Sequence, residues 1–339
     1  MQKIAKILII LAVLSLLLGC TPKIVTDYSW KPTKPIQIIV PWGAGGASDL
    51  IARVTATIME KELGVRIIIS NQPGASGATG TKATMDADKD GYTWTAGSAA
   101  DLGLYKVTGA LDTDIRDDWE LFLSMQSIGL ISVNANSRYQ TFDDLMADFR
   151  ARPGQITVSS AGLMSSGTRN IEALRRFTGI QYRNIPYDGG GPAVTALVAG
   201  EVQVTAQLAS EQADMIRGGR IRPLAILMME DFNLSGYGVI PSIKQFVPEY
   251  SAGSNFFGIF IPKGVPDEVI ETVTRIWNEK IAGNEELIKF ADERGMVFNP
   301  SYGEEAQARA FAYYQPAAWV FFDTNQTTIS PDTVGIPRP

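Results

Sequence analysis

The sequence contains no histidine and only one cysteine among its 339 residues. Without histidine, the chain cannot form a Ser-His or Cys-His catalytic pair or offer an imidazole to a metal ion. A single cysteine excludes intrachain disulfides, cysteine-rich zinc sites and iron–sulfur clusters. Basic residues number 30 against 36 acidic ones, so the formal net charge is −6 and no nucleic-acid-binding face is expected. We therefore expect no metal, no cofactor and no catalytic activity.

The first residues have the pattern of an export signal. A positively charged start precedes a 12-residue apolar run, 7–18, which is too short to span a bilayer but suits a signal-peptide core. The run ends in Leu-Leu-Gly-Cys, which resembles a bacterial lipobox with Cys20 as the acylated residue. We predict a lipoprotein signal peptide over 1–19 and a polar tether over 20–33; the alternative is an ordinary signal peptide with a coincidental cysteine.

Short apolar runs typical of buried strands alternate with stretches of helical periodicity through the rest of the chain. Between the first two runs, Leu50, Val54 and Ile58 recur at helical spacing, and Gly64 ends that helix. This alternation predicts an α/β protein with largely parallel sheets. The expected strands cover 36–40, 65–70, 92–96, 128–133, 156–159, 182–185, 202–206 and 224–227.

Three glycine-rich turns join expected strands to expected helices, over 41–49, 159–168 and 186–192. Glycine lets the backbone approach a ligand closely, and the free N–H groups at a helix start favour an anion. Each turn alone could be a tight turn without a ligand. Three such turns at the carboxyl ends of strands favour a binding site, because open α/β sheets bind ligands at that edge.

Three other interpretations of local motifs are weaker. The segment 86–91 copies the start of a calcium loop, but its twelfth position would be Gly97 instead of glutamate. The glycines of 43–46 only partly match a dinucleotide fingerprint, since Ser48 stands where a third glycine belongs. A serine or aspartate nucleophile in the turns would lack a histidine base.

Several ordered motifs resemble the periplasmic receptors of tripartite tricarboxylate transporters, the Bug or TctC-like family. None of the motifs is very specific alone, but their order and spacing match over about 34–299. They are 41–53, 71–80, Asp-Gly-Tyr-Thr at 90–93, Arg-Pro-Gly at 152–154, Ser-Ala-Gly at 160–162, Ile-Pro-Tyr at 185–187, Ala-Gly-Glu-Val at 199–202 and 257–262.

The resemblance implies a type II periplasmic-binding-protein fold, in which two crossing strands join two α/β lobes around a ligand cleft. With crossings near 126–130 and 254–258, lobe one covers 30–128 plus 257–339 and lobe two covers 129–256. The implied function is capture of a small organic carboxylate and its delivery to the large and small membrane subunits of the transporter. We expect a monomer in the cell envelope, periplasmic or on the outer membrane face, lipid-anchored through Cys20. Alternatives are a lipid-anchored sensor and, from the residues alone, a cleft enzyme.

Family members bind ligands through backbone amides and hydroxyls of the first two turns, so the resemblance carries those positions over to this chain. The sequence departs from the family pattern at Trp42, Gln72, Thr168 and Asp188, and the last two changes remove a positive or protonatable partner from lobe two. Trp42, Tyr187 and Phe256 could stack on an aromatic ligand, although an aromatic side chain at a strand end is more often part of the core. The predicted ligand-binding residues are Trp42, Gly45, Gly46, Ala47, Ser48, Ala161, Gly162, Ser165, Ser166, Thr168, Tyr187 and Asp188.

Overall fold

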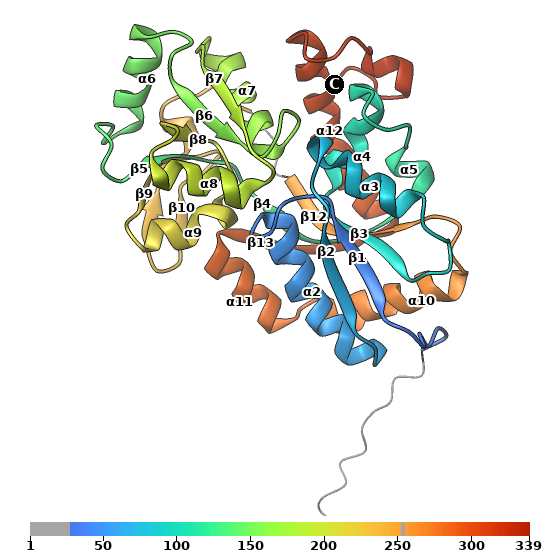
Figure 1. The fold of residues 1–339 in the computed structure, drawn as a ribbon. Helices are drawn as coiled ribbons and strands as arrows, with labels where there is room; N and C mark the ends of the chain where they lie inside the picture. Colours follow the sequence, from blue (N-terminus) through green and yellow to red (C-terminus); the bar gives the residue numbers. More distant parts are fainter. Residues whose placement is uncertain (1–27, 252–254) are drawn as a thin grey trace, which may run out of the picture.

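A computed structural model describes residues 28–251 and 255–339, which form two α/β lobes side by side (Figure 1). The predicted signal peptide and Cys20 lie outside the described residues. The first lobe is built on a six-stranded sheet of order β13-β4-β12-β3-β1-β2 and the second on a five-stranded sheet of order β7-β6-β8-β5-β9.

The six-stranded sheet combines parallel and antiparallel pairs. Ile38 of β1 lies beside Ile69 of β2 and Trp94 of β3 in parallel register, whereas β12 and β13 run antiparallel to β4. The strands are β1 (Ile36–Val40), β2 (Ile67–Asn71), β3 (Thr93–Ser98), β4 (Trp119–Ser127), β12 (Asn255–Pro262) and β13 (Met296–Tyr302). The helices are α2 (Ala47–Leu63), α3 (Ala78–Met85), α4 (Ala99–Thr108), α5 (Ile115–Asp118), α10 (Asp267–Ile276), α11 (Glu285–Arg294) and α12 (Gly303–Asp323).

The five-stranded sheet is also mixed, since β5 runs antiparallel to both β8 and β9. The strands are β5 (Leu130–Asn134), β6 (Thr157–Ser160), β7 (Arg183–Pro186), β8 (Val204–Thr205) and β9 (Ile221–Ile226), with a separate ribbon of β10 (Phe232–Leu234) and β11 (Gly238–Ile240). The helices are α6 (Phe142–Ala151), α7 (Ser166–Thr178), α8 (Gly190–Ala199) and α9 (Ala209–Arg217). The expectation of largely parallel sheets is therefore wrong, because strands far apart in the sequence pair antiparallel with the parallel set.

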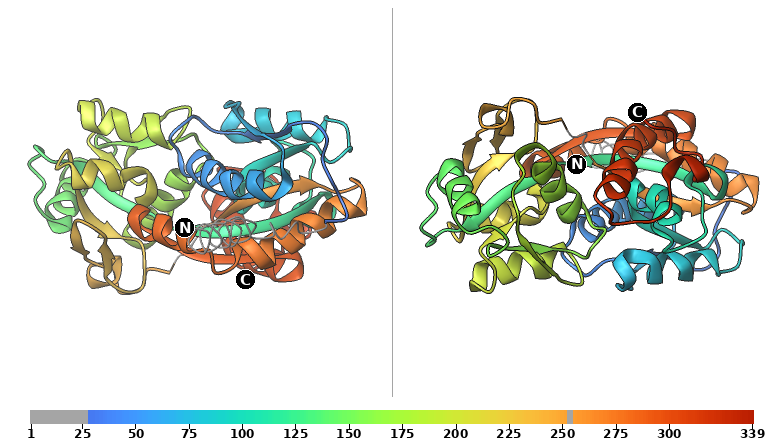
Figure 2. Two further views of the ribbon diagram at one scale, coloured as in Figure 1. Left: turned by 90° about the horizontal axis from the view of Figure 1, so that it is seen from below. Right: turned by 90° about the horizontal axis from the view of Figure 1, so that it is seen from above.

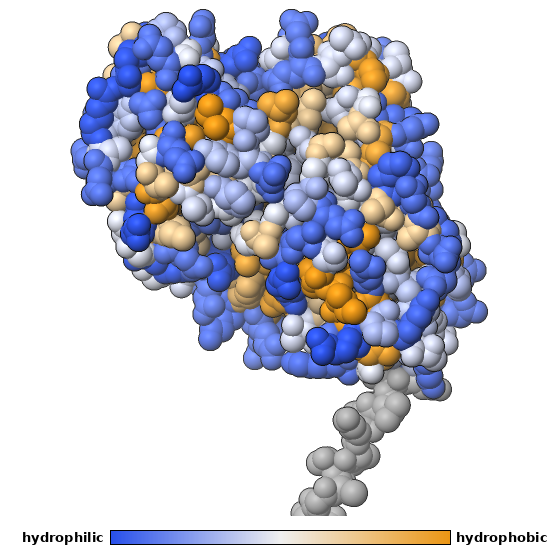
Figure 3. Space-filling model, viewed as in Figure 1, coloured by the Kyte–Doolittle hydropathy of each residue, from blue (hydrophilic) through white to orange (hydrophobic). Residues whose placement is uncertain are grey.

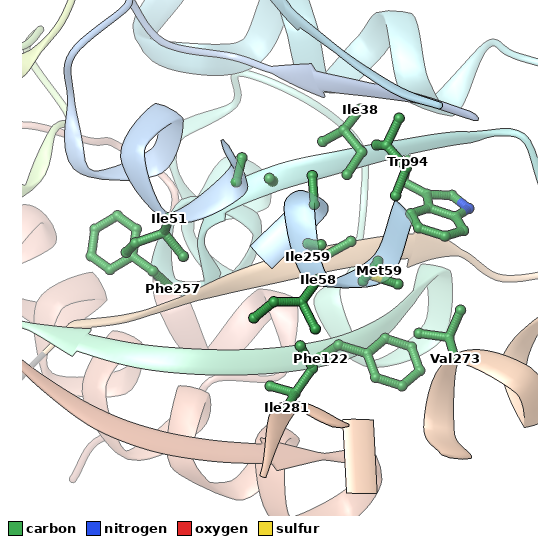
Figure 4. Close-up of a cluster of buried hydrophobic side chains, with 14 of the residues drawn as sticks. Ile38, Ile51, Ile58, Met59, Trp94, Phe122, Phe257, Ile259, Val273 and Ile281 are labelled. Atoms are coloured by element: carbon green, nitrogen blue, oxygen red, sulfur yellow. The ribbon is translucent and has the colours of Figure 1, made fainter. Parts of the chain in front are cut away.

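Alternate residues of the central strands lie on opposite faces of the sheet and belong to two different hydrophobic clusters of the first lobe. Phe122 of β4 and Ile259 of β12 belong to the cluster under α2, while Leu121, Leu123 and Phe260 belong to the cluster under α4 and α12. Figure 4 shows the first of these, with Ile58 and Met59 of α2 beside Ile259 and Phe122 of the sheet. This packing fixes the amino end of α2 at the edge of the lobe that faces its neighbour.

The chain passes from the first sheet to the second through Ile128 and Gly129, between β4 and β5. Both views of Figure 2 show this path running along the length of the molecule from one lobe into the other. In the space-filling view, hydrophilic residues form most of the outline and hydrophobic residues gather in patches inside it (Figure 3). No helix within the described ranges is long and apolar enough to cross a bilayer.

Candidate binding site between the lobes

The first and third glycine-rich turns touch each other across the lobe boundary. The Gly43 N–H donates to the Asp188 carbonyl oxygen at 3.0 Å. A Cβ atom at Gly43 would lie 2.5 Å from that oxygen, so the approach requires glycine. Gly45 has a φ of 78°, in the left-handed region that glycine adopts without strain, and Gly46 then precedes the first residue of α2. These backbone constraints aim the start of α2 at the second lobe.

Two adjoining cavities lie where the turns meet, and they share Trp42 and Ala161. The deep cavity has a free volume of about 20 Å³, room for one water molecule. Seven of the residues predicted from the sequence to bind the ligand line this cavity: Trp42, Gly46, Ala47, Ser48, Ala161, Ser165 and Ser166. The outer cavity has a free volume of about 220 Å³. Five of the residues predicted to bind the ligand line it: Trp42, Ala161, Gly162, Tyr187 and Asp188.

Two predicted residues lie apart from both cavities. Gly45 lines a neighbouring open groove with Tyr187, and its N–H donates to Asp49 Oδ2 at 3.0 Å. Thr168 lies behind the second turn, where its hydroxyl donates to the Gly162 carbonyl oxygen at 2.8 Å. Thr168 therefore holds the shape of the turn instead of facing the cavities.

A buried ion pair joins the lobes beside the deep cavity. Arg169, in the first turn of α7, donates from Nη1 to Asp101 Oδ1 of α4 at 3.1 Å, and the two residues are only 5% and 8% exposed. Trp42 Nε1 donates to the other Asp101 oxygen at 3.0 Å. Burial raises the pKa of Asp101, while the guanidinium and the tryptophan oppose that rise. Arg169 supplies a cation that the substitutions at Thr168 and Asp188 had suggested lobe two would lack.

The ion pair extends into a network of polar side chains. Arg169 Nη2 donates to Ser166 Oγ at 3.0 Å, and Asn255 Nδ2 donates to the same oxygen at 2.8 Å. Ser98, which precedes α4, donates to Asn255 Oδ1 at 2.8 Å. Ser166 thus acts both as a lining residue of the deep cavity and as a link between the lobes.

A second carboxylate, Glu211, lies where the three turns converge. Its Oε1 accepts from the Ala47 N–H at the start of α2 at 3.0 Å, and its Oε2 accepts from the Leu208 N–H at 3.3 Å. The Gln207 amide, oriented to satisfy its neighbours, donates to Oε2 at 3.0 Å and accepts from the Ala161 N–H at 2.7 Å. Burial raises the pKa of Glu211 to about 7, and the hydrogen bonds from Ala47 and Leu208 oppose the shift.

A third carboxylate supports the first turn from behind. Asp49 receives hydrogen bonds from the Gly45 N–H and from Asn71 Nδ2, each at 3.0 Å, and forms an ion pair with Arg53 at 2.8 Å. Burial opposes ionisation of Asp49, but these partners hold its pKa below the ordinary value. Asn71 belongs to a motif quoted for the family resemblance, and the structure shows that it fixes the turn.

The sequence prediction missed Ser76, Asp101, Arg169 and Glu211. Ser76 lines the outer cavity from the same 71–80 motif, with an unusual φ of 53°. Asp101 is the only charged residue in the first seven residues of α4, which was a usable signal of a buried polar role. Arg169 and Glu211 each stand in the first turn of a helix, where their side chains are ordinary surface residues in most proteins. Within 28–251 and 255–339, no group of three or more acidic or cysteine residues could hold a metal ion.

Comparison with known proteins shows the family to which this two-lobed chain belongs. A family model described as "Tripartite tricarboxylate transporter family receptor" matches residues 51–319. The chain belongs to this family. Among its relatives, protein BugT of Bordetella pertussis is 30% identical over 292 residues, which cover 85% of this chain and 88% of BugT.

Two solved structures share the fold of this tripartite tricarboxylate transporter receptor. Rpa4515 of R. palustris, solved with adipate, is 23% identical, with 87% of this chain and 98% of the other covered at a TM-score of 0.77. MatC of Rhodopseudomonas palustris, solved with bound malate, is 20% identical, with 85% and 99% covered at a TM-score of 0.76. The family resemblance and the two-lobed fold are therefore confirmed.

As a member of this family, the chain is a periplasmic solute-binding receptor. Its relatives are receptors that serve transporters, so an enzyme that uses a serine or aspartate of the cleft is set aside. The family also connects it with the membrane subunits of a tripartite transporter.

Proposed function

We propose that this receptor binds a small organic carboxylate between its lobes and hands it to the membrane subunits of its transporter. The observation that carries the proposal is the meeting of two helix amino ends, those of α2 and α7, at one cavity lined by four serine side chains, Ser48, Ser98, Ser165 and Ser166. Helix amino ends favour negative groups, and hydrogen bonds to a carboxylate are charge-assisted. The adipate and malate of the two structural relatives are ligands of this class.

Ligand entry requires the lobes to move. The deep cavity holds about one water molecule, so a carboxylate reaches Ser48 only after the lobes part. The outer cavity between Trp42 and Tyr187 provides the adjoining space for the body of the ligand. Two lobes joined by a few strands can hinge at the connections and close again on the ligand.

A thermal-shift screen of mono-, di- and tricarboxylates tests the proposal. A ligand present at 100 times its dissociation constant adds about 2.7 kcal/mol to stability, enough for a clear rise in Tm. Uncharged analogues of the same shape serve as controls. Stabilisation by the analogues alone, or by no carboxylate, would refute the proposal.

We also propose that lipid on Cys20 tethers the receptor to the membrane. The charged start, the short apolar run and the position of the only cysteine support this anchor. Cys20→Ser should release the protein from the membrane fraction or leave the precursor unprocessed. Unchanged membrane association of the processed Cys20→Ser protein would contradict it.

A further inference from the structure

Glu211 accepts the hydrogen bond of a donor, the Ala47 N–H, that would bind the ligand carboxylate under the proposed function. The Ala47 N–H opens helix α2 and lines the deep cavity, and Glu211 of lobe two accepts its hydrogen bond at 3.0 Å. A Cβ atom at Gly190 would lie 2.0 Å from Glu211 Oε1, so the third glycine-rich turn is shaped around this carboxylate. The protein thus places a carboxylate of its own at the α2 amino end.

The site cannot hold the Glu211 carboxylate and a ligand carboxylate together. The deep cavity leaves about 20 Å³, less than a carboxylate group needs. Two carboxylates on the same donor would also repel each other where little water screens them. A ligand that binds at α2 must therefore replace Glu211.

Glu211 has room to withdraw. Its side chain lies between the deep cavity and the open groove lined by Gly191 and Arg294, which has a free volume of about 710 Å³. Glu211 is the third residue of α9, and its bond to the Leu208 N–H lies within its own lobe. Among the hydrogen bonds that Glu211 forms with described residues, the bond to Ala47 is the one that crosses to the other lobe, so that bond is the one exchanged.

We propose that Glu211 is a specificity-determining residue that competes with the anionic ligand for the amino end of α2. This inference rests on the proposed function, since it presupposes a carboxylate ligand at that position. The apparent affinity of the receptor is then the intrinsic affinity of the site multiplied by the fraction of molecules in which Glu211 has left the site. Anions that bind weakly do not occupy the amino end of α2, because they cannot replace the Glu211 carboxylate that the fold holds there.

The test is Glu211→Gln, with isothermal titration of malate, adipate, acetate and citrate into the purified full-length receptor at pH 8, where Glu211 is ionised because its pKa is about 7. Glutamine keeps the shape and reach of the side chain, and it is accepted at the third position of a helix. A hydrogen bond to a neutral acceptor is about half as strong as one to a carboxylate, so the variant should bind anions roughly fivefold to tenfold more tightly. A gain in affinity is also a result that damage to the fold would not produce.

Asp143→Asn is the matched control. Asp143 lies exposed in the first turn of α6, and this change alters the net charge by the same amount far from the cleft. Tighter binding by Glu211→Gln but not by Asp143→Asn supports the proposal, as does anion binding that appears only in Glu211→Gln. Unchanged or weaker binding by Glu211→Gln overturns it, while binding to the parent still upholds the proposed function. Binding of no carboxylate to either protein overturns both.

Discussion

Helices α2 and α7 face each other across the cleft, and each is met by a carboxylate from the opposite lobe. At α7, Asp101 of lobe one forms an ion pair with Arg169, so the negative charge of its carboxylate is balanced by the guanidinium. At α2, Glu211 of lobe two accepts from the Ala47 N–H, and the groups that donate to it are neutral amides. The two junctions share a design, but they differ in burial and in charge: Asp101 is buried beside the Arg169 guanidinium, whereas Glu211 is partly buried and faces neutral donors.

This difference separates a fixed contact from an exchangeable one. A buried ion pair resists disruption, because removal of one partner leaves the other charge unpaired in a poorly solvated place. A carboxylate held by neutral donors can be neutralised by one proton, or replaced by another carboxylate that accepts the same bonds. The α7 junction therefore stabilises the closed arrangement of the lobes and opens only when they part, whereas the α2 junction suits ligand exchange.

Loss of the compensated carboxylate should have the largest effect on stability. Asp101→Asn leaves the Arg169 guanidinium buried and charged, because arginine does not lose its proton at accessible pH. We expect the free energy of unfolding in urea to fall by about 3–5 kcal/mol.

The double variant Asp101→Asn/Arg169→Met provides the control for this prediction. Replacement of a whole buried ion pair by uncharged groups is often close to neutral, so the double variant should recover most of the lost stability. Equal losses in the single and double variants would show that the two residues act independently and that the α7 junction is not an ion-pair contact.

Glu211, the carboxylate without a countercharge, should instead make the free energy of unfolding depend on pH. Burial raises the pKa of Glu211 from 4.5 to about 7, so its contribution to stability is complete below pH 4.5 and is lost as the pH rises towards 7. Glu211→Gln lacks this loss, so its stability relative to the parent should increase over that interval. Each pKa unit corresponds to about 1.4 kcal/mol, so a rise from 4.5 to 7 sets an upper limit of about 3.5 kcal/mol.

The composition makes this titration easy to recognise. Histidine, the side chain that ordinarily titrates between pH 5 and 8, is missing from the sequence. A difference between the parent and Glu211→Gln that develops below pH 7 therefore has few competing sources. Parallel stability profiles of the two proteins from pH 4.5 to 8 would mean that Glu211 is not buried in this way.

The parts of the fold that local pattern specifies were predictable. The run 36–40 is strand β1, and the Gly-rich turn and helical spacing after it lead into α2. The antiparallel strands β4, β12 and β13 were not foreseen as sheet partners, because their pairing joins segments more than 100 residues apart. Local periodicity describes a strand's faces and carries no information about its neighbours.

The candidate site divides in the same way. Backbone donors could be located from glycine-rich turns, because helix starts follow from local sequence. The carboxylates that meet them could not: Asp101 and Arg169 are 68 residues apart, and Ala47 and Glu211 are 164 residues apart. Such pairs exist only once two lobes are placed against each other.

Serine substitutions on the two sides should then have different consequences. Ser48→Ala removes a hydroxyl that lines the deep cavity, and we expect carboxylate affinity to fall about 10- to 150-fold with little change in stability. Ser166→Ala also deprives Arg169 and Asn255 of a shared acceptor, so it should lower Tm as well. Calorimetric titration and thermal unfolding of both variants measure the two effects. Identical behaviour of the variants would remove the distinction between the sides.

The smallest effect is expected at the rim, where a third carboxylate also crosses between the lobes. Asp214 of α9 forms ion pairs with Arg217 of its own lobe and Arg294 of the other, but its side chain is 57% exposed. Water and salt screen such a pair, so Asp214→Asn should change the free energy of unfolding by less than about 1 kcal/mol. That small change should shrink further at high ionic strength, unlike the effect of Asp101→Asn. A loss at Asp214 as large as that at Asp101 would show that crossing the boundary, and not burial beside a countercharge, determines the strength of these contacts.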